Sequence, residues 1–232
     1  MNALPIVSIR PEPGLSATVA GGAAEGFEII GAPLFAIRPL VWELPDVEQF
    51  DGLLIGSANA IRHGGALINQ CRHLPVYAVG KATAELAIEC GFHVALVGEG
   101  GLQNVLDSLA GERLHLLRIT GVEHRPLSVP PSITLTERIA YTSEALPMPG
   151  ELAGELAKGG IIMLHSGAAA QHFVKECNRL GVNRKLLYIA ALAPRIAEAA
   201  GDGWAGRHCA AAPNEAALLE LVGQLCHDLR EG

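Results

Sequence analysis

Positive charge is scarce in this chain. Its 232 residues include 17 Lys and Arg against 24 Asp and Glu, which gives a formal net charge of −7. The basic residues are scattered along the sequence and form no cluster. Proteins that bind a nucleic-acid backbone depend on clustered basic residues, because each contact with a phosphate releases a counterion. We therefore expect no nucleic-acid partner.

Aromatic residues and long hydrophobic runs are also few. Aromatics make up 4% of a chain that is 50% hydrophobic and 18% charged, with a mean hydropathy of +0.30. This composition supplies ample material for a core and argues against disorder. Uninterrupted apolar stretches such as residues 186–193 are too short to span a bilayer. The first apolar run is broken at Arg10 and Pro11, too early for a signal peptide. We expect a cytoplasmic protein without a membrane partner.

Cysteine pairs with metal-binding or redox spacing are absent. The five cysteines stand at positions 71, 90, 177, 209 and 226, and no Cys-x-x-Cys pair occurs. An odd, scattered set in an unexported chain is typical of reduced thiols. The neighbours His208 and Cys209, and likewise Cys226 and His227, do not form a metal-binding pattern, because adjacent residues seldom bind one metal.

Motifs for nucleotides, hydrolases and metalloenzymes are missing as well. The sequence has no GxxxxGK[ST] loop, and the glycine-rich residues 98–101 lack the GxGxxG spacing. The serine after Gly56 is not part of a GxSxG elbow. No HExxH occurs, and His63, His73 and His115 are typical of surface or strand-end residues. We expect neither a metal nor a nucleotide cofactor, so catalysis would depend on positioning and electrostatics around a reactive substrate.

Short apolar runs alternate with Ala-rich segments along most of the chain. The runs that predict strands are residues 4–9, 27–30, 52–55, 76–79, 93–97, 114–117, 133–135, 161–164, 187–190 and 208–211. Segments with helical spacing separate most of them, among them 61–70, 82–90 and 171–180. Apolar strands without polar alternation, separated by helices, are typical of parallel sheets covered on both faces. The sequence therefore predicts an α/β fold.

Three segments of the chain recur later in the same order. GLLIGSANA, which contains Ser57, resembles GIIMLHSGAA, which contains Ser166, at a distance of 109 residues. AVGKATAE at 78–85 resembles ALAPRIAE at 191–198, at a distance of 113 residues. A pair of leucines at 106 and 109 matches Leu and Val at 219 and 222, again 113 residues apart. Three matches in one order at nearly constant distance indicate two similar halves.

The second half lacks the end of the first, and the missing piece lies at the start of the chain. The first half continues through a strand that ends at Arg118 and a run that ends at Tyr141, whereas the second half ends in a helix. Residues 4–10 match the Arg118 strand, and residues 27–35 match the run into Tyr141.

This displaced repeat predicts two similar parallel-sheet α/β lobes. One lobe is discontinuous and consists of residues 1–36 and 142–232, and the other consists of residues 37–141. The chain then crosses between the lobes near 35–40 and near 138–143. We expect the two crossing strands to pair as a two-stranded linker and to act as a hinge.

Small, hydroxylic or basic residues follow several of the predicted strands, where helices begin. Ligands of open parallel sheets bind at this edge, because helix N-termini offer free N–H donors and a positive dipole to anions. The residues at these positions are Arg10, Ser57, Ala58, Asn59, Gly80, Lys81, Thr83, Arg118, Ser166, Gly167, Ala168 and Arg195. Because both lobes carry such residues on the same edge, we expect a cleft between the lobes that binds a sizeable small-molecule anion.

Several of these residues also have a purely structural explanation. Ser57 and Ser166 are of the type that caps a helix N-terminus. Arg10, Lys81 and Arg118 are of the type found as ordinary solvated charges. From the residues alone both explanations stay open.

Six segments together resemble the uroporphyrinogen-III synthase family. They are Ile9-Arg10-Pro11, FDGLLIGSANA at 50–60, VYAVGKATA at 76–84, RIAY at 138–141, IMLHS at 162–166 and PNEAALL at 213–219. The segments occur in order over essentially the whole chain. The resemblance implies two α/β lobes joined by a two-stranded linker, which the displaced repeat predicts independently.

The resemblance also implies a reaction. Members of the family cyclise the linear tetrapyrrole hydroxymethylbilane to uroporphyrinogen III in haem biosynthesis. They expel water from the ring A hydroxymethyl group and invert ring D through a spiro intermediate, without a cofactor. The substrate carries eight carboxylates and loses its hydroxyl group readily, so the protein mainly folds it and directs which carbon attacks.

The same resemblance assigns roles to individual residues. Tyr141 is the candidate acid or orienting residue. The candidate contacts to substrate carboxylates are Ser57, Asn59, Lys81, Thr83 and Ser166, with Arg10 and Arg118 as further cations.

The chain departs from the family pattern at three places. Gly56 stands where the family usually has Thr, and His165-Ser166-Gly167 stands where Phe-Ser-Pro or Thr-Ser-Pro is usual. Residues 193–196 replace a Gly-Pro followed by hydroxyl residues, and Arg195 offers a substitute charge there. The alternatives to a synthase are a non-catalytic two-lobed module that binds a small anion and a diverged synthase-like protein. Since the sequence shows no coiled coil, we expect a monomer.

Overall fold

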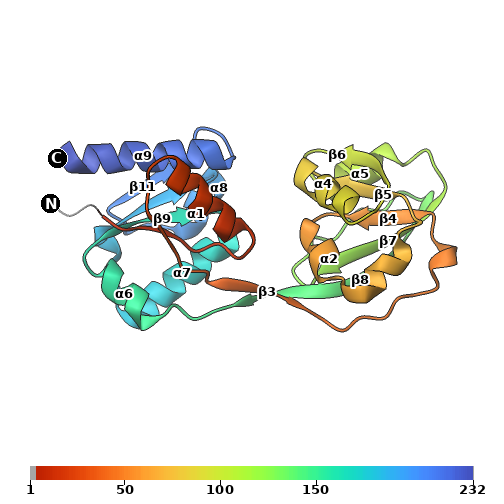
Figure 1. The fold of residues 1–232 in the computed structure, drawn as a ribbon, viewed down its shortest axis with the longest axis horizontal. Helices are drawn as coiled ribbons and strands as arrows, with labels where there is room; N and C mark the ends of the chain where they lie inside the picture. Colours follow the sequence, from red (N-terminus) through yellow and green to blue (C-terminus); the bar gives the residue numbers. More distant parts are fainter. Residues whose placement is uncertain (1–3, 232) are drawn as a thin grey trace. The chain divides into compact units, whose positions relative to one another are not determined.

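The computed structural model describes residues 4–231, which form two compact units (Figure 1). Unit 1 comprises the chain up to Ala36 together with the chain from Glu144 onward, and unit 2 is the continuous segment Ile37–Ser143. The boundaries lie at 36/37 and 143/144, beside the sequence-based boundaries at 36/37 and 141/142.

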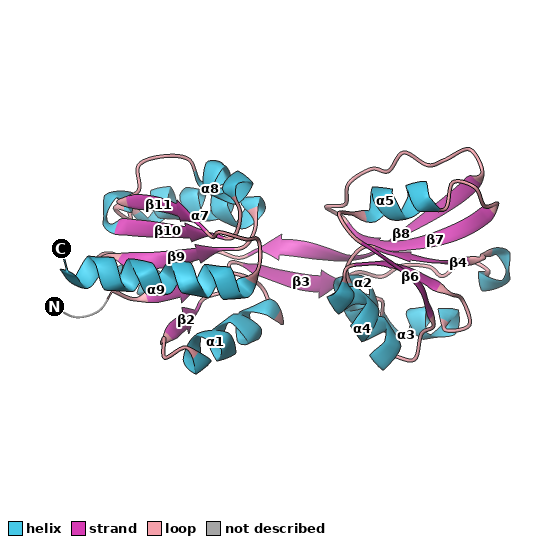
Figure 2. Ribbon diagram, turned by 90° about the horizontal axis from the view of Figure 1, so that it is seen from above, coloured by secondary structure: helices cyan, strands magenta, loops and turns pink. Residues whose placement is uncertain are grey.

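Unit 1 contains a parallel sheet with helices on both faces. Its strands, in the order in which they pair, are β11 (Gly206–Cys209), β10 (Leu187–Ala191), β9 (Gly160–Leu164), β1 (Ile6–Ser8) and β2 (Ile29–Gly31). Its helices are α1 (Gly14–Ala24), α6 (Gly150–Leu156), α7 (Gly167–Leu180), α8 (Pro194–Ala200) and α9 (Glu215–Glu231), with a 3-10 turn at Arg184–Leu186. Helices α1 and α9 pack on one face of the sheet, and α6, α7 and α8 pack on the other (Figure 2).

Unit 2 repeats this arrangement. Its strands, in pairing order, are β3 (Phe35–Pro39), β8 (Ile133–Ala145), β7 (Leu114–Gly121), β4 (Gly52–Ile55), β5 (Val76–Val79) and β6 (Val94–Gly98). Its helices are α2 (Ala58–His63), α3 (Gly65–Ile68), α4 (Lys81–Glu89) and α5 (Leu102–Ser108), with 3-10 turns at Val47–Gln49 and Asn69–Cys71. Helices α2, α3 and α4 cover one face of the sheet and α5 covers the other.

The two sheets have the same strand order under the correspondence that the repeat predicts. In unit 2 the strands run β8, β7, β4, β5, β6, and in unit 1 they run β2, β1, β9, β10, β11. Strand β1 therefore takes in unit 1 the place of β7 in unit 2, although the two strands stand at different places in the sequence.

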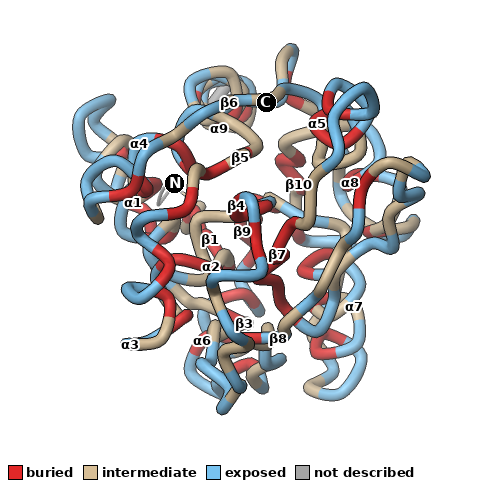
Figure 3. The backbone as a smooth tube through the Cα atoms, turned by 90° about the vertical axis from the view of Figure 1, so that its right-hand side faces the viewer, coloured by how far each residue is buried: buried red, intermediate tan, exposed pale blue. Residues whose placement is uncertain are grey.

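Burial explains why these strands carry so few polar residues. Every residue of β1, β4 and β9 is buried, because helices cover both faces of each sheet (Figure 3). Apolar residues on both faces leave no polar alternation, which is the pattern from which the α/β class was predicted. That prediction is confirmed.

Two predicted elements differ from the structure. The expected helix at 61–70 is broken into α2, α3 and a 3-10 turn, because Gly65 adopts a left-handed φ of +67° that ends the regular helix. Strand β8 is much longer than the expected 133–135, because its ladder with β7 runs from Ile133 to Tyr141 and the strand then continues to Ala145.

The chain crosses between the units through β3 and the end of β8. The N–H of Leu40 donates to the carbonyl of Ala140 at 2.8 Å, and the N–H of Leu146 donates to the carbonyl of Leu34 at 2.9 Å. Residue numbers rise along one crossing segment as they fall along the other, so the two segments pair antiparallel. Within the described part of the chain, no helix is long and apolar enough to cross a membrane.

Candidate functional site

A serine follows β4 in unit 2 and starts the next helix. Ser57 has an extended backbone (φ −155°, ψ 140°), and its Oγ accepts a hydrogen bond from the Asn59 N–H at 3.2 Å. Ser57 is therefore the N-cap of α2, with Ala58 and Asn59 in the first turn. The structural explanation of this serine holds, and the positive end of α2 lies at the carboxyl end of the central strand β4.

Tyr141 reaches this edge through an irregularity in β8. The ladder with β7 pairs Thr120 with Ile139 but Gly121 with Tyr141, so Ala140 is an extra residue and forms a β-bulge. Paired residues in a parallel ladder point to the same face, so Tyr141 shares the face of Gly121 and Ile119, which is covered by α2 and α4. Without the bulge, alternation would keep Tyr141 on the same face as Ile139.

Three neighbours surround the Tyr141 ring. A Cβ on Gly121 would come within 2.5 Å of the ring, so the ring lies directly against the backbone of this glycine. The His63 ring, at the end of α2, lies with its centroid 6.2 Å away at an angle of 45°. The Ser57 hydroxyl lies close enough to the phenol to lower its pKa. Tyr141 is thus half-buried between the bulge and the first turn of α2.

Burial raises the pKa of Tyr141 above its ordinary value of 10. The interaction with Ser57 and the charge of Arg118 lower this pKa and the charge of Glu123 raises it, but burial dominates. The phenol carries its proton at neutral pH, as a phenol of ordinary pKa also does, and burial holds that proton more firmly.

Arg118 lies beneath this edge on the other face of the sheet. It is only 4% exposed, and its guanidinium donates to Oε1 of Glu137, its register partner on β8, and to the Arg125 carbonyl at 3.0 Å. Its Nε is buried without a hydrogen-bond partner. A second contact to Glu137 comes from His124 Nε2, 3.7 Å from Oε2. Arg118 is a buried, paired charge and not a solvated one.

Glu123 fastens the chain after the bulge. Its carboxylate accepts hydrogen bonds from Thr142 Oγ1 at 3.2 Å and from the Ser143 N–H at 3.3 Å. The turn after β7 and the end of β8 are therefore tied together on either side of Tyr141.

The next helix of unit 2 carries three predicted residues. Gly80 follows β5 with a left-handed φ of +77° and precedes α4, a conformation that favours glycine. Lys81 has an 88% exposed side chain that lies 3.5 Å from Glu85 one turn later. Thr83 is buried at 6% exposure. Lys81 is therefore the exposed cation of this edge, and Thr83 belongs to its packing.

The corresponding edge of unit 1 holds the other predicted residues. Ser166 caps α7, with its Oγ accepting from the Ala169 N–H at 3.1 Å. Gly167 and Ala168 form the first turn, and a Cβ on Gly167 would be in ordinary van der Waals contact with Ala199 of α8, at 3.5 Å. Arg195 is an exposed residue in the first turn of α8.

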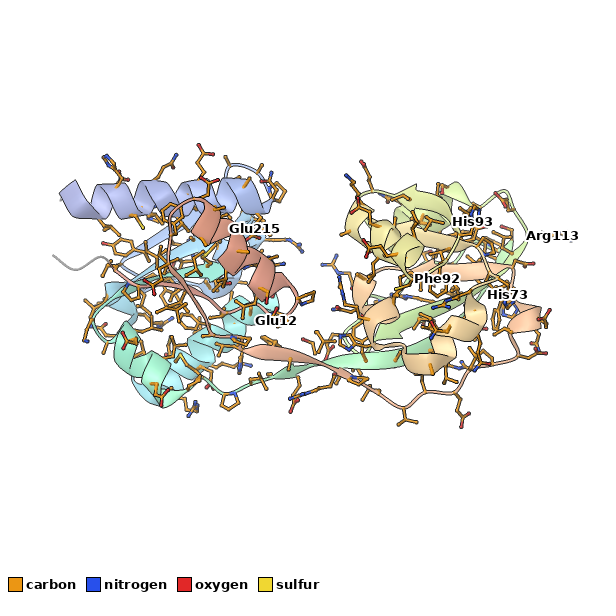
Figure 4. All side chains as sticks on the ribbon, viewed as in Figure 1. Glu12, His73, Phe92, His93, Arg113 and Glu215 are labelled. Atoms are coloured by element: carbon orange, nitrogen blue, oxygen red, sulfur yellow. The ribbon has the colours of Figure 1, made fainter. Side chains whose placement is uncertain are left out.

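Arg10 is engaged by a carboxylate that the sequence did not suggest. Its Nη1 donates to Glu215 Oε2 at 2.9 Å and to Thr18 Oγ1 at 3.1 Å, and Glu215 also contacts His165. Glu215 is labelled in Figure 4. Arg10 is an internally paired charge in this structure, and not a free cation at the edge of the sheet.

Two of the predicted residues lie close together in unit 2. Ser57 and Tyr141 are neighbours although no motif joins them in sequence, whereas Arg118 lies on the other face of the sheet and acts on Tyr141 through its charge. Among the described residues, no three His, Cys, Asp or Glu side chains cluster as metal ligands. The sequence did not predict five further residues of the candidate site. They are Thr18, Gly121, Glu123, Glu137 and Glu215. Of these five, only Gly121 has a local sequence pattern that could have indicated a role, because it is a glycine at the end of a strand.

Comparisons with known proteins agree with the α/β fold. A family model described as uroporphyrinogen-III synthase HemD matches residues 16–220. The chain is similar in structure to uroporphyrinogen-III synthetase from Helicobacter pylori 26695, with a TM-score of 0.67 and 16% identity over 96% of this chain and 99% of that one. It is also similar to a mutant uroporphyrinogen III synthase from the extremely thermophilic bacterium Thermus thermophilus, with a TM-score of 0.53 and 13% identity over 97% and 100%. None of the curated proteins compared with the chain matches it.

Proposed function

The chain belongs to the uroporphyrinogen-III synthase family, a family of cyclising lyases of porphyrin biosynthesis, and from this we propose how it acts. It cyclises hydroxymethylbilane to uroporphyrinogen III, with loss of water and inversion of ring D. Tyr141 supplies the proton, and residues at the carboxyl ends of the strands bind the substrate carboxylates.

The position and protonation of Tyr141 carry this proposal. The bulge at Ala140 places the phenol beside Ser57, and the phenol carries its proton at neutral pH because its pKa lies above the ordinary value of 10. The chemistry needs such a donor, because the ring A hydroxyl group leaves more easily as water than as hydroxide. A positioned acid contributes about 10²–10⁴-fold to a rate.

The remaining steps need orientation more than chemistry. Loss of water leaves a reactive, electron-poor ring A carbon, and ring D attacks it through its substituted position to give the spiro intermediate. The protein favours this attack by holding the chain of four pyrroles in a folded conformation. Such a substrate supplies its own reactivity, so the proposed reaction uses no cofactor.

Two kinds of group are suited to bind the substrate carboxylates. Backbone N–H groups of first helical turns suit anions, as does the positive end of the helix dipole. The residues proposed to bind carboxylates in this way or through a side chain are Arg10, Ser57, Ala58, Asn59, Gly80, Lys81, Thr83, Ser166, Gly167, Ala168 and Arg195. Arg118 acts from below, since it is buried in its pair with Glu137 and adds positive charge near Tyr141.

We also propose the setting of the reaction. The chain works as a monomer in the cytoplasm, its partner is the small polycarboxylate substrate, and neither nucleic acid nor a membrane takes part. Both lobes, with boundaries at 36/37 and near 142, contribute residues to substrate binding. The family and the residues at the strand ends support this setting.

The test is an assay with hydroxymethylbilane generated by a separate enzyme. The uncatalysed closure gives uroporphyrinogen I, so chromatographic separation of the type I and type III isomers reports on catalysis directly. We expect type III to dominate when the chain is present. Type I alone would overturn the proposal and favour a non-catalytic anion-binding module.

A further inference from the structure

Three donors in unit 1 converge on one carboxylate. Glu215, the first residue of α9, receives hydrogen bonds from Arg10 Nη1 at 2.9 Å and from Thr18 Oγ1 at 2.6 Å. His165 Nε2 lies 3.3 and 3.2 Å from its two oxygens. Because an ionised carboxylate only accepts hydrogen bonds, the His165 nitrogen that faces it is the one that carries hydrogen.

These donors come from separate elements at the carboxyl end of the sheet. Strands β1 and β9 pair Ser8 with Met163, so two residues further on Arg10 comes level with His165 and points to the same face. Helix α1 covers this face and adds Thr18, which is fully buried. The site is therefore built by the fold itself.

The side chains of this cluster differ in burial. The His165 side chain is 8% exposed, whereas the side chains of Arg10 and Glu215 are 29% and 33% exposed. The Nδ1 of His165 is buried and has no hydrogen-bond partner, so this ring has one nitrogen unused. The inner wall of the site is fixed, and the carboxylate that fills it reaches solvent.

The site favours a charged carboxylate strongly. Burial alone would raise the pKa of Glu215, but hydrogen bonds from His165 and Thr18 and the charges of His165 and Arg10 lower it to about 2. A set of donors that stabilises this carboxylate so well suits other carboxylates too, because the contacts are made to the charged group alone.

Helix α9 does not need Glu215 in order to begin. Asn214 precedes it, and the Asn214 side chain accepts a hydrogen bond from the Ala217 N–H at 3.0 Å, as a helix cap does. The Asn214 carbonyl accepts from the Leu218 N–H at 3.2 Å. Glu215 is therefore available to leave the site without releasing the start of the helix.

We propose that Arg10, Thr18 and His165 form a binding site for a carboxylate of the substrate, and that Glu215 occupies this site until the substrate displaces it. This inference rests on the proposed function, since it requires a polycarboxylate substrate. The internal carboxylate has the advantage of high effective concentration. A substrate with several carboxylates overcomes it, because its other carboxylates are already bound elsewhere and make the exchange intramolecular.

The first test is the KM for hydroxymethylbilane. In Glu215→Gln the competing charge is gone, while the amide keeps the shape of the side chain and one acceptor oxygen, so only one of the two donors, Arg10 or Thr18, keeps its partner. We expect KM to fall by roughly fivefold or more. The fall should disappear when Arg10→Gln is added. Glu220→Gln makes the same charge change at an exposed position on α9 and is the matched control. An unchanged or raised KM in Glu215→Gln would overturn the proposal.

The second test does not depend on catalysis. Sodium propionate, a simple carboxylate, is titrated into Glu215→Ala and followed by NMR at the Thr18 amide and the His165 ring. We expect saturable shifts with propionate and none with the neutral propionamide at equal concentration. Wild-type protein should bind propionate more weakly, because Glu215 competes. Absence of saturable shifts would refute the carboxylate site, whereas failure to form the type III isomer would refute the proposed function alone. Circular dichroism and Tm verify that each variant is folded.

Discussion

Tyr141 is placed by two residues that carry no reactive group. Ala140 is the extra residue of the bulge, and Gly121 leaves the space that the ring fills. The phenol then lies beside Ser57 with its pKa raised by burial. The position of the proposed proton donor is thus set by backbone geometry before any substrate binds.

Replacing Tyr141 by Phe removes the donor and keeps the ring. We expect Tyr141→Phe to lower kcat about 100-fold, in the range of general-acid effects, with little change in KM. Steady-state formation of the type III isomer measures both constants. Tyr77→Phe, on β5 of the same unit, is the matched control and should retain activity. A kcat of Tyr141→Phe equal to that of wild type would make Tyr141 a structural residue of the linker.

Gly121 is a positioning residue, since it acts through Tyr141. In Gly121→Ala the new Cβ would meet the Tyr141 ring at 2.5 Å, so the ring must move and kcat should fall at least tenfold. In the Tyr141→Phe background the same change should cost little further kcat. Gly111→Ala, where a Cβ meets nothing within 4 Å, is the control. An equal loss in both backgrounds would mean that Gly121 acts through the stability of the fold.

Two helices begin at serines that look alike but differ in their neighbours. Ser57 caps α2 and Ser166 caps α7, each through its Oγ, but only Ser57 also contacts Tyr141. A serine N-cap therefore has an additional effect in unit 2, where it also influences Tyr141.

Replacing each cap by Ala separates these roles. Ser57→Ala and Ser166→Ala should each lower the free energy of unfolding by about 1 kcal/mol, measured in urea. Only Ser57→Ala should also raise the pKa of Tyr141, because the interaction with Ser57 lowers it. NMR titration of the Tyr141 ring measures this pKa. A Tyr141 pKa that rises equally in Ser166→Ala would contradict the assignment.

Elements with a strong local pattern were predictable from the sequence. Strands β4 and β5 begin and end at the predicted residues, because each is a short apolar run between turn residues. Most of β8 was missed, since the residues after 135 are largely polar and lie on a half-buried strand between β7 and β3. The bulge at Ala140 could not be predicted, because the bulged residues of β8 include neither Gly nor Pro.

The cluster of Arg10 and Glu215 in unit 1 could not be predicted from the sequence for a different reason. Arg10 and Glu215 are 205 residues apart, and only the displaced order of the strands brings them together. No local pattern joins such residues. The sequence predicted Arg10 as a site residue. Its partner Glu215 could not be predicted, because it depends on how α9 packs beside α1.

At the scale of the whole molecule, each unit has its own hydrophobic core. In unit 1 a buried acid helps to hold the chain that follows the crossing. Glu176 on α7 accepts from the Met148 N–H at 2.7 Å and pairs with Arg179. The hydrogen bond from Arg179, against the opposing effect of burial, lowers the pKa of Glu176 to about 2.

Unit 1 should therefore lose stability in acid. The pKa of Glu176 is lower in the folded chain than its ordinary value of 4.5, so its contribution is complete above pH 4.5 and is lost as the pH falls toward 2. Glu176→Gln should cost roughly 2–3 kcal/mol of unfolding free energy at pH 7 and much less at pH 2. Urea unfolding at both pH values measures this, with the exposed Glu155→Gln as control. A cost that is independent of pH would contradict it.

The position of β1 between β2 and β9 has a consequence for synthesis on the ribosome. Strand β9 follows β1 by about 150 residues, which take on the order of 10–30 s to translate. Unit 2 is continuous and can complete its sheet during this interval, while β1 still lacks a neighbour on one side. The first strand to emerge is thus among the last to be fully paired, and folding of unit 1 ends only after α9 has left the ribosome and brought Glu215 to Arg10.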